Sequence, residues 1–202
     1  MNENNPKHHR VAIIGDSTFF HSGLTGLLDA VASNANMTVV IVDNSITAMT
    51  GGQQHPGSGK DLMGEIGPKI PIEDVVTGLG VKHLIVTDTY EYDKTLELLK
   101  EAVKHEGPSV LIARRPCALF PKKIGIDPYV ILDDPCSGCG NCLRIGCPAI
   151  SISGRKTDRG MHIPEITADA CTGCTLCQQV CKDDAIFSIA EMKKSSGEEV
   201  EA

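Results

Sequence analysis

The fold of the last third of the chain is decided by two cysteine runs, Cys136-x2-Cys139-x2-Cys142-x4-Cys147-Pro148 and Cys171-x2-Cys174-x2-Cys177-x3-Cys181. Together the runs hold eight of the nine cysteines. A thiolate at every third residue can wrap around the corners of an iron–sulfur cubane, while a more distant fourth cysteine reaches a different cubane. The spacing therefore indicates iron–sulfur chemistry.

Two other uses of cysteine fit the runs less well. Zinc sites take two pairs of ligands separated by a long loop, not three closely spaced cysteines followed by a fourth. Disulfides suit secreted chains, and nothing in the sequence indicates secretion. The two runs also repeat one another, as a pseudo-twofold cluster domain requires.

The runs resemble the two-cluster ferredoxin pattern, in which the fourth cysteine of each run binds the other cluster. The resemblance implies a small α+β domain over 135–190 with two [4Fe–4S] clusters. It assigns Cys136, Cys139, Cys142 and Cys181 to the first cluster, and Cys171, Cys174, Cys177 and Cys147 to the second. The chain departs from the pattern in the four-residue gap before Cys147 and in Lys182, where a proline usually follows.

Composition limits the remaining functions. The net charge of −7 disfavours nucleic-acid binding, and 3% aromatic residues with no Trp disfavour a base-stacking platform. The same charge suits docking to basic electron-transfer partners. We expect disordered ends at 1–10 and 191–202, no signal peptide, no membrane span, and a reducing cytoplasm.

Residues 11–115 predict an α/β domain with a parallel sheet. Apolar runs predict strands at 11–14, 37–42, 83–87 and 110–113, and helical spacing predicts helices at 23–33, 72–79 and 91–105. Alternation of this kind is typical of a parallel sheet with helices on both faces. A Gly-rich segment at 50–71 is expected to cross the surface, and 116–134, with three prolines, to be a linker.

This predicted sheet is short. Four strands are few for an open parallel sheet covered on both sides, and a structureless loop of ~20 residues is usually functional. We therefore expect another segment or another chain to complete the domain.

Polar residues follow the first two predicted strands, as Gly15-Asp16-Ser17-Thr18 and Asp43-Asn44-Ser45-Ile46. Ligands of parallel sheets bind beyond the carboxyl ends of the strands. Asp16 and Asn44 can lie side by side there, and their oxygens suit Mg²⁺. Gly15, Ser17 and Gly23 would let backbone N–H groups approach a diphosphate. On these residues alone, an ordinary turn with Asp16 as helix cap remains the main alternative.

The longer strings Gly-Asp-Ser-Thr-Phe-Phe-His-Ser-Gly (15–23) and Asp-Asn-Ser-Ile-Thr-Ala-Met-Thr-Gly-Gly-Gln-Gln-His-Pro-Gly (43–57), followed by the cysteine runs, are more specific. They resemble the thiamine diphosphate-dependent 2-oxoacid:ferredoxin oxidoreductases, in particular the C-terminal part of the indolepyruvate:ferredoxin oxidoreductase α subunit. The resemblance extends from about Val11 to Ile189.

The resemblance implies a site and an activity. Asp16, Asn44 and the backbone carbonyl of Ile46 would bind Mg²⁺, and Gly15, Ser17 and Thr18 would lie at the diphosphate. The activity would be oxidative decarboxylation of a 2-oxoacid, an indolepyruvate or another arylpyruvate, to an acyl-coenzyme A. Electrons would pass through the two clusters to ferredoxin. The pyrimidine-binding domain of such enzymes has no counterpart here, so a partner would have to supply it.

Several further residues are ambiguous. Met49 stands where pyruvate-type relatives carry asparagine and suits an aryl substrate, but simple packing explains it equally well. His21 and His55 are expected to be surface or structural histidines rather than proton donors, and Cys117 an idle thiol. Arg114-Arg115 would be a solvated strand end or an anion site.

Two rival functions remain open. The chain could be an electron-transfer protein whose α/β region only docks partners, or a truncated gene product.

Overall fold

The structure is a computed structural model that describes residues 9–61, 63–118 and 127–196. It divides the chain into two compact units, Met1–Pro121 and Lys122–Ala202. Each unit is described by itself.

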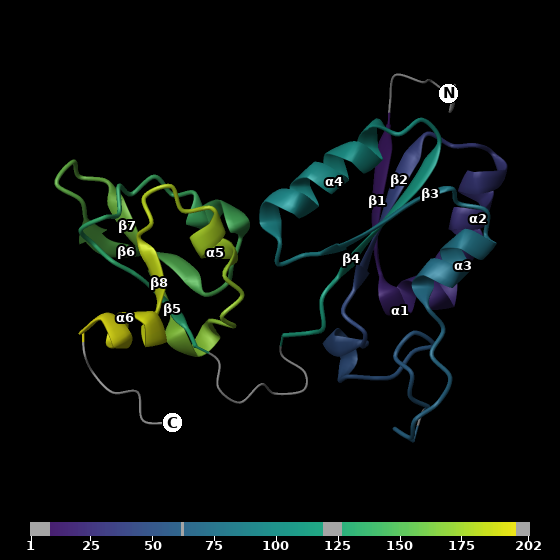
Figure 1. Ribbon diagram of the computed structural model, residues 1–202, viewed down its shortest axis with the longest axis horizontal. Helices are drawn as coiled ribbons and strands as arrows, with labels where there is room; N and C mark the ends of the chain where they lie inside the picture. Colours follow the sequence, from purple (N-terminus) through teal and green to yellow (C-terminus); the bar gives the residue numbers. More distant parts are fainter. Residues whose placement is uncertain (1–8, 62, 119–126, 197–202) are drawn as a thin grey trace. The chain divides into compact units, whose positions relative to one another are not determined.

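The first unit is the predicted parallel α/β domain (Figure 1). Its four strands are β1 (Arg10–Gly15), β2 (Met37–Asp43), β3 (His83–Asp88) and β4 (Pro108–Arg114). They form one sheet in the order β1-β2-β4-β3, and every neighbouring pair is parallel. All four strand predictions and the fold class are confirmed.

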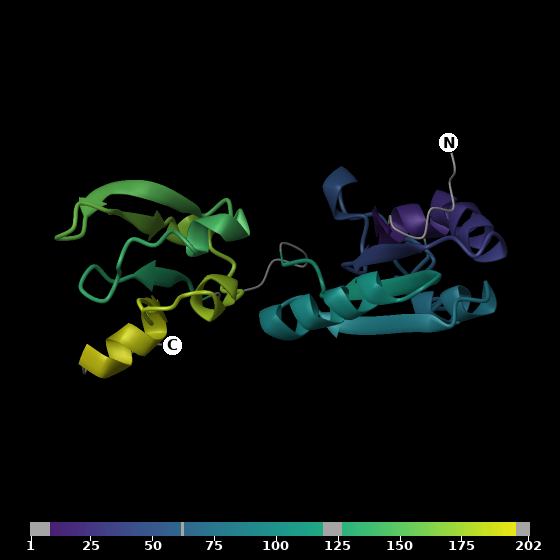
Figure 2. The ribbon, with the colours of Figure 1, turned by 90° about the horizontal axis from the view of Figure 1, so that it is seen from above.

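Helices cover both faces of this sheet (Figures 1 and 2). On one face α2 (Leu24–Ala32) and α3 (Ile72–Gly78) contribute Leu27, Ile72 and Val76 to the main core. On the other face α4 (Tyr92–Lys104) packs Leu98, Leu99 and Ala102 against the central strands. These helices match the predicted ones to within one or two residues at most ends.

Helical structure begins earlier than the sequence predicts. It starts at Asp16 with α1 (Asp16–Thr18) and continues through a π-helical segment (Phe19–Gly23) into α2, whereas the prediction starts at residue 23. Gly23 lets the helical stretch lie close to the side chain of Ile14 in β1, because a Cβ on Gly23 would lie 2.7 Å from Ile14 Cδ1. Inserted π turns of this kind are frequent at functional sites.

The edge strand β1 is poorly covered. Ile13 is 73% exposed and Val11 50% exposed, on the face that α4 covers over the central strands. The expectation that a further segment completes this sheet remains a prediction.

The second unit is a small α+β domain with two antiparallel strand pairs. β5 (Tyr129–Ile131) pairs with β8 (Ile186–Ser188), and β6 (Ile150–Lys156) pairs with β7 (His162–Ile166). Short helices at Cys142–Ile145, Ala168–Ala170, α5 (Leu176–Gln179) and α6 (Ile189–Ser196) complete it. Six of the cysteines share one core with five buried apolar residues: Tyr129, Ile131, Ile150, Ile163 and Ile186.

Two predicted boundaries in the second unit need correction. Strand β5 lies inside the predicted linker 116–134, because Tyr129 and Ile131 are buried against β8. Helix α6 runs to Ser196 instead of giving way to a disordered tail at 191. Its start is fixed by Ser188 and Glu191, each of whose side chains accepts a backbone N–H from the other residue.

The beginning of the chain also differs from the prediction of a solvated, disordered 1–10. His9 bonds Asn36 (3.0 Å) and Thr38 (2.8 Å), and Arg10 begins β1. The rest of that predicted segment, 1–8, lies outside the described residues, as do 119–126 of the predicted linker and 197–202 of the predicted tail. In the described part of the chain, no helix has the length and apolar character needed to span a membrane.

A histidine pair at the amino-terminal end of the sheet makes stability sensitive to pH. The rings of His83 and His105 stack at 4.1 Å, and His83 lies 3.5 Å from Glu101. Burial lowers the pKa of His105, the nearby His83 and His9 lower it further, and Glu106 opposes them. A lowered folded-state pKa favours the neutral ring, so this contribution is present above about pH 6.5 and is lost as the pH falls.

We therefore expect the α/β unit to lose stability between about pH 7.5 and pH 5.5. The measurement is hydrogen exchange of β3 and α4 peptides at both pH values, corrected for the intrinsic exchange rate. His105→Gln should flatten the pH dependence. An unchanged pH dependence in that variant would contradict the assignment to His105.

Candidate functional site

Asp16 joins the carboxyl ends of β1 and β2. Its carboxylate is buried and accepts three backbone N–H groups: Ser17 on Oδ1 at 2.7 Å, and Asn44 and Ser45 on Oδ2 at 3.1 and 2.8 Å. The two strand ends therefore meet as expected. Asp16 is the first residue of α1, so the N-cap position is Gly15 and Asp16 is not the helix cap.

The loop after β2 turns tightly around Asn44. Asn44 Oδ1 accepts the N–H of Ile46 at 3.2 Å, and Ser45 takes a left-handed conformation (φ 62°). The carbonyl of Ile46 accepts the N–H of Ala48 at 3.0 Å. The three oxygen groups predicted for Mg²⁺ thus belong to two adjoining loops, and each is held by backbone hydrogen bonds.

The predicted diphosphate residues lie at the start of the helical stretch. Ser17 Oγ accepts a hydrogen bond from Thr47 at 2.9 Å, which ties the start of the helix to the second loop. Thr18 follows in the same turn. A Cβ built on Gly15 would meet no atom within 4 Å, so the backbone here is open to an approaching ligand.

The second acidic residue, Asp43, is neutralised by its own partner. Arg114 Nε donates to Asp43 at 2.6 Å, and its two terminal nitrogens donate to Glu73 at 2.6 and 2.9 Å. The bond to Arg114 lowers the pKa of Glu73, and the bond to Glu73 is the main cause that raises the pKa of Arg114.

Arg115 pairs with Asp88 and lies over the ring of Tyr90. Neither arginine is the solvated end or anion site that the sequence suggests.

Asp16, by contrast, has no Lys or Arg partner among the ion pairs of the described residues. Burial raises the pKa of its carboxyl group, and the nearby Asp43 adds to the rise, while the Ser17 N–H and His55 oppose it. A buried carboxylate short of positive charge, beside amide and carbonyl oxygens, is the donor set that suits a small divalent cation. The residues therefore fit Mg²⁺.

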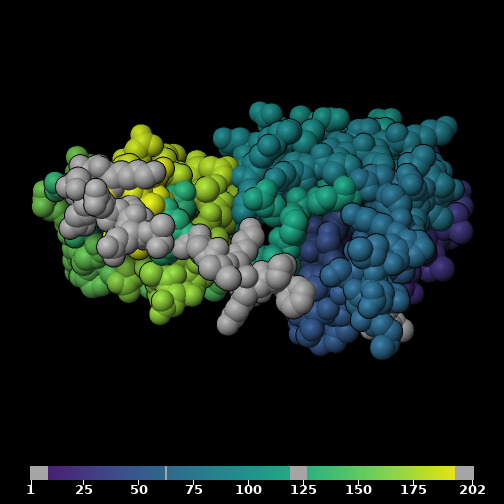
Figure 3. Space-filling view, turned by 60° about the horizontal axis from the view of Figure 1, so that its bottom comes forward, coloured from purple at the N-terminus to yellow at the C-terminus, as the bar shows by residue number. Residues whose placement is uncertain are grey.

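The glycine-rich segment between β2 and α3 lies on the surface of its unit (Figure 3), and it carries one buried histidine. The Nε2 atom of His55 lies 3.2 Å from Asp16 Oδ2.

The other ambiguous residues lie differently. His21 is exposed, and its Nδ1 lies 2.6 Å from the Ser17 carbonyl. Met49 is 99% exposed, so its side chain is not packed against the described residues. Cys117 donates its N–H to the Asn44 carbonyl at 3.2 Å, close to the site but through its backbone.

In the second unit, cysteines of the two runs lie close to one another. One small cavity is lined by four cysteines, with Cys181 beside three members of the first run: Cys136, Cys139 and Cys142. Burial raises the pKa of Cys142, and Cys136 and Cys181 raise it further.

The second group of neighbouring thiols also combines cysteines of both runs. Burial raises the pKa of Cys177 to about 12, and its neighbours Cys174, Cys171 and Cys147 add to the rise. Crowded thiols of this kind oppose one another's ionisation, and bound iron would reverse that, because metal ligation requires thiolates.

Turns and backbone donors shape both sets. Gly138, Gly140 and Gly173 have positive φ, and a Cβ on Gly138 would lie 2.7 Å from Met161. The Tyr129 N–H points at the sulfur of Cys171 (3.5 Å), and the Ala185 N–H at that of Cys181 (3.4 Å). Hydrogen bonds to cluster sulfurs tune reduction potential.

The sequence departure at Lys182 is accommodated locally. Lys182 is exposed, and the next residue, Asp183, accepts the N–H and O–H of Ser137. The segments that carry Cys136 and Cys181 are therefore held together without a proline.

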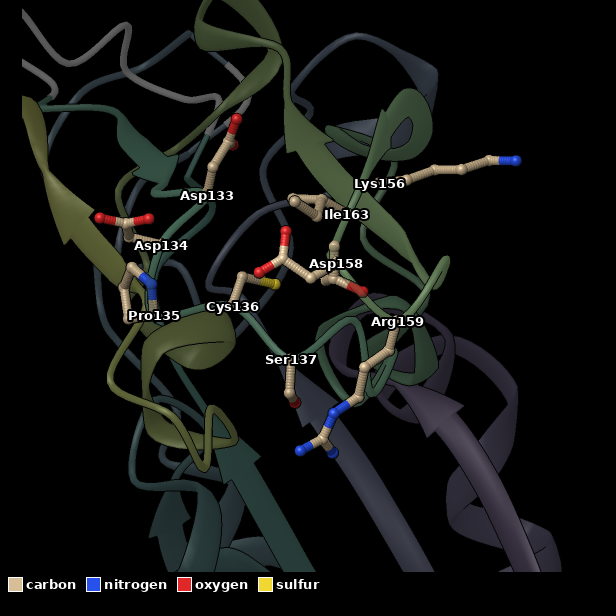
Figure 4. A pocket seen from close by; sticks show the side chains of 10 residues that line it. Asp133, Asp134, Pro135, Cys136, Ser137, Lys156, Asp158, Arg159 and Ile163 are labelled. Carbon is tan, nitrogen blue, oxygen red and sulfur yellow. The ribbon is translucent and has the colours of Figure 1, made fainter.

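A cavity of about 370 Å³ opens beside Cys136, between residues 133–137 and the turn from β6 to β7 (Figure 4). The sulfur of Cys136 points towards the carboxylate of Asp158, while Lys156 extends away from the cavity. Asp133 is paired with Arg155.

Within residues 9–61, 63–118 and 127–196, no three His, Cys, Asp or Glu side chains are placed to share a single metal ion.

Comparisons with known proteins agree with both halves of this description. The family described as "Thiamine pyrophosphate enzyme, C-terminal TPP binding domain" matches residues 1–113, and the 4Fe-4S dicluster domain matches residues 135–185. The chain is 39% identical over 198 residues to "Indolepyruvate oxidoreductase subunit IorA" of Thermococcus kodakarensis, which covers 94% of this chain and 29% of the relative. The IorA of Archaeoglobus fulgidus is 38% identical over 182 residues, covering 87% and 28%. The chain thus spans less than a third of these curated relatives.

Among solved structures, one match is the 2-oxoglutarate:ferredoxin oxidoreductase of Magnetococcus marinus. The alignment covers 95% of this chain and 64% of the solved chain, with 18% identity and a TM-score of 0.48. The predicted resemblance is confirmed by the IorA relatives and by both domain matches. This chain belongs to the thiamine pyrophosphate enzymes, whose C-terminal TPP-binding domain it carries, followed by a 4Fe-4S dicluster domain.

Proposed function

We propose that this chain is the diphosphate-binding and electron-transfer part of a 2-oxoacid:ferredoxin oxidoreductase acting on indolepyruvate or a similar arylpyruvate. The observation that carries the proposal is the Asp16 carboxylate, buried where two strand ends meet and linked by backbone N–H groups to the Asn44 loop. The names of the IorA relatives support the substrate class.

In this proposal Asp16, Asn44 and the Ile46 carbonyl hold Mg²⁺. The Asn44 and Ile46 oxygens each accept one hydrogen bond and keep a second lone pair for a metal. Gly15, Ser17 and Thr18 face the diphosphate, with the start of the helical stretch favouring its negative charge. When bound, thiamine diphosphate supplies the carbon nucleophile for decarboxylation, and this chain positions it.

The crossed thiol sets hold the two [4Fe–4S] clusters. Cys136, Cys139, Cys142 and Cys181 hold the first, and Cys171, Cys174, Cys177 and Cys147 the second. The backbone donors of Ala185 and Tyr129 reach one sulfur in each set, so each cluster receives at least one N–H bond that tunes its potential. Electrons leave the chain through these clusters to ferredoxin.

The remaining parts of the enzyme lie outside this sequence. The chain spans 29% of its Thermococcus relative, and β1 leaves Ile13 and Val11 exposed at the sheet edge. We propose that a segment carrying the pyrimidine-binding domain completes the pocket, that coenzyme A accepts the acyl group, and that the complex works in the cytoplasm. The exposed Met49, six residues after Asp43, adds apolar surface suited to an aryl substrate.

Protein purified without oxygen should carry about eight iron and eight sulfide per chain, the content of two cubanes. Iron and acid-labile sulfide assays measure this directly. About four iron per chain, or stoichiometric zinc, would contradict the two-cluster assignment.

Cys147→Ser should disturb the cluster held by the second cysteine run and leave the first intact. The measurement is paramagnetic resonance of the reduced protein, compared with Cys142→Ser as the matched variant for the other cluster. Damage by Cys147→Ser confined to the cluster of Cys136, Cys139 and Cys142 would show that the ligation is not crossed.

The chain alone should not decarboxylate any 2-oxoacid. Combined with the partner that carries the pyrimidine domain, it should reduce a viologen dye with indolepyruvate and coenzyme A. Asp16→Ala should abolish this activity by removing a Mg²⁺ ligand, while the iron content stays unchanged because the clusters lie in the other unit.

Turnover by the isolated chain, or full activity of Asp16→Ala in the complex, would refute this assignment of the site. Reduction of the clusters by an external donor in both proteins serves as the control for an intact electron path.

A further inference from the structure

We propose that His55 is a positioning residue that holds the Asp16 carboxylate in its metal-binding orientation. This inference rests on the proposed Mg²⁺ site. The two side chains come from segments 39 residues apart, yet His55 is 1% exposed and Asp16 5% exposed where they meet. A histidine placed against a metal ligand helps to fix the orientation of that ligand.

The hydrogen bonds of the imidazole determine which nitrogen carries the proton. His55 Nδ1 accepts the N–H of Gly57 at 3.2 Å, so in the neutral ring Nε2 must be the protonated nitrogen. Nε2 lies 3.2 Å from Asp16 Oδ2, within reach of a hydrogen bond but not aligned for one. It is a buried donor with no hydrogen-bond partner in the described residues, and it faces the candidate metal ligand.

The surrounding loop holds the ring in place. The ring stacks on Phe20 with centroids 5.7 Å apart and planes at 29°. Ser58 Oγ donates to the His55 carbonyl at 2.8 Å and accepts the His55 N–H at 3.2 Å. A Cβ on Gly57 would lie 2.6 Å from Phe20 and 3.2 Å from His55, so only glycine leaves room for this stack.

Among the ion pairs of the described residues, His55 is the side-chain partner of Asp16. Three backbone N–H groups donate to the Asp16 carboxylate, and the Arg114 guanidinium is occupied by Asp43 and Glu73. His55 therefore supplies the side-chain contact that can set the rotation of the carboxylate. Loss of such a contact to a metal ligand typically lowers metal affinity by about 10–100-fold.

Two substitutions separate the two nitrogens of the ring. In His55→Gln the terminal amide nitrogen can replace Nε2 and still reach Asp16. In His55→Asn the amide oxygen can replace Nδ1 and still accept the Gly57 N–H, but nothing reaches Asp16. The second variant therefore keeps the loop bond and removes the proposed contact.

The first measurement needs no metal. Long-range ¹⁵N–¹H spectra of the full chain, assigned with His55→Gln, should show His55 protonated on Nε2, and its Nε2 signal should shift in Asp16→Asn. An Nδ1-protonated ring, or a signal that ignores Asp16→Asn, would overturn the contact.

The second measurement is Mn²⁺ binding to the full chain in the presence of thiamine diphosphate, followed by paramagnetic resonance. Affinity should fall about 10–100-fold in His55→Asn and recover largely in His55→Gln, with wild-type rates of proteolysis in the 50–71 loop for His55→Asn. Wild-type affinity in His55→Asn, with loss in Asp16→Asn, would overturn the role of His55 and leave the proposed function intact.

Two other results would overturn the inference. If both His55 variants lose affinity in proportion to faster loop cleavage, His55 only packs the loop. If Asp16→Asn binds Mn²⁺ as tightly as the wild type, the metal site itself fails, and the positioning role fails with it.

Discussion

The buried Asp16 carboxylate is the constraint on which the organisation of the α/β unit depends. It gathers the end of β1, the start of the helical stretch and the loop after β2, through three backbone N–H donors. Burying a carboxylate is unfavourable unless hydrogen bonds and charge offset the loss of water. Here the hydrogen bonds are present and, among the ion pairs of the described residues, no Lys or Arg pairs with Asp16, while the neighbouring Asp43 has Arg114. This asymmetry distinguishes a structural ion pair from a carboxylate suited to bind a cation.

The second unit follows a different physical principle. Its core is small, and the partly or fully buried thiols of six cysteines pack within it or against it. Without metal those thiols contribute modest packing and raise one another's pKa, as Cys142 and Cys177 show. Domains of this size usually need metal or disulfide bridges for stability, so the fold of this unit and its clusters are expected to depend on one another.

The sequence predicts the elements that periodicity controls. The four strands and their alternation with helices follow from apolar runs, and the cysteine spacing indicates iron–sulfur chemistry. It does not predict the helical start at Asp16; in this stretch Gly23 leaves room for the side chain of Ile14, which is a tertiary feature. Strand β5 is hidden because three residues among prolines carry little periodicity, and α6 was missed although Ser188 and Glu191 form a recognisable capping pair. The burial of His55 depends on how a nonperiodic loop folds back.

The central claim is that Asp16 binds the divalent cation of a thiamine diphosphate site. The most direct test is a crystal structure of the assembled complex with thiamine diphosphate and Mn²⁺, using the anomalous scattering of manganese. The account predicts one manganese at about 2.1 Å from an Asp16 oxygen, also bound by Asn44, the Ile46 carbonyl and the diphosphate. A manganese bound elsewhere, or a diphosphate that does not contact the loops after β1 and β2, would contradict it.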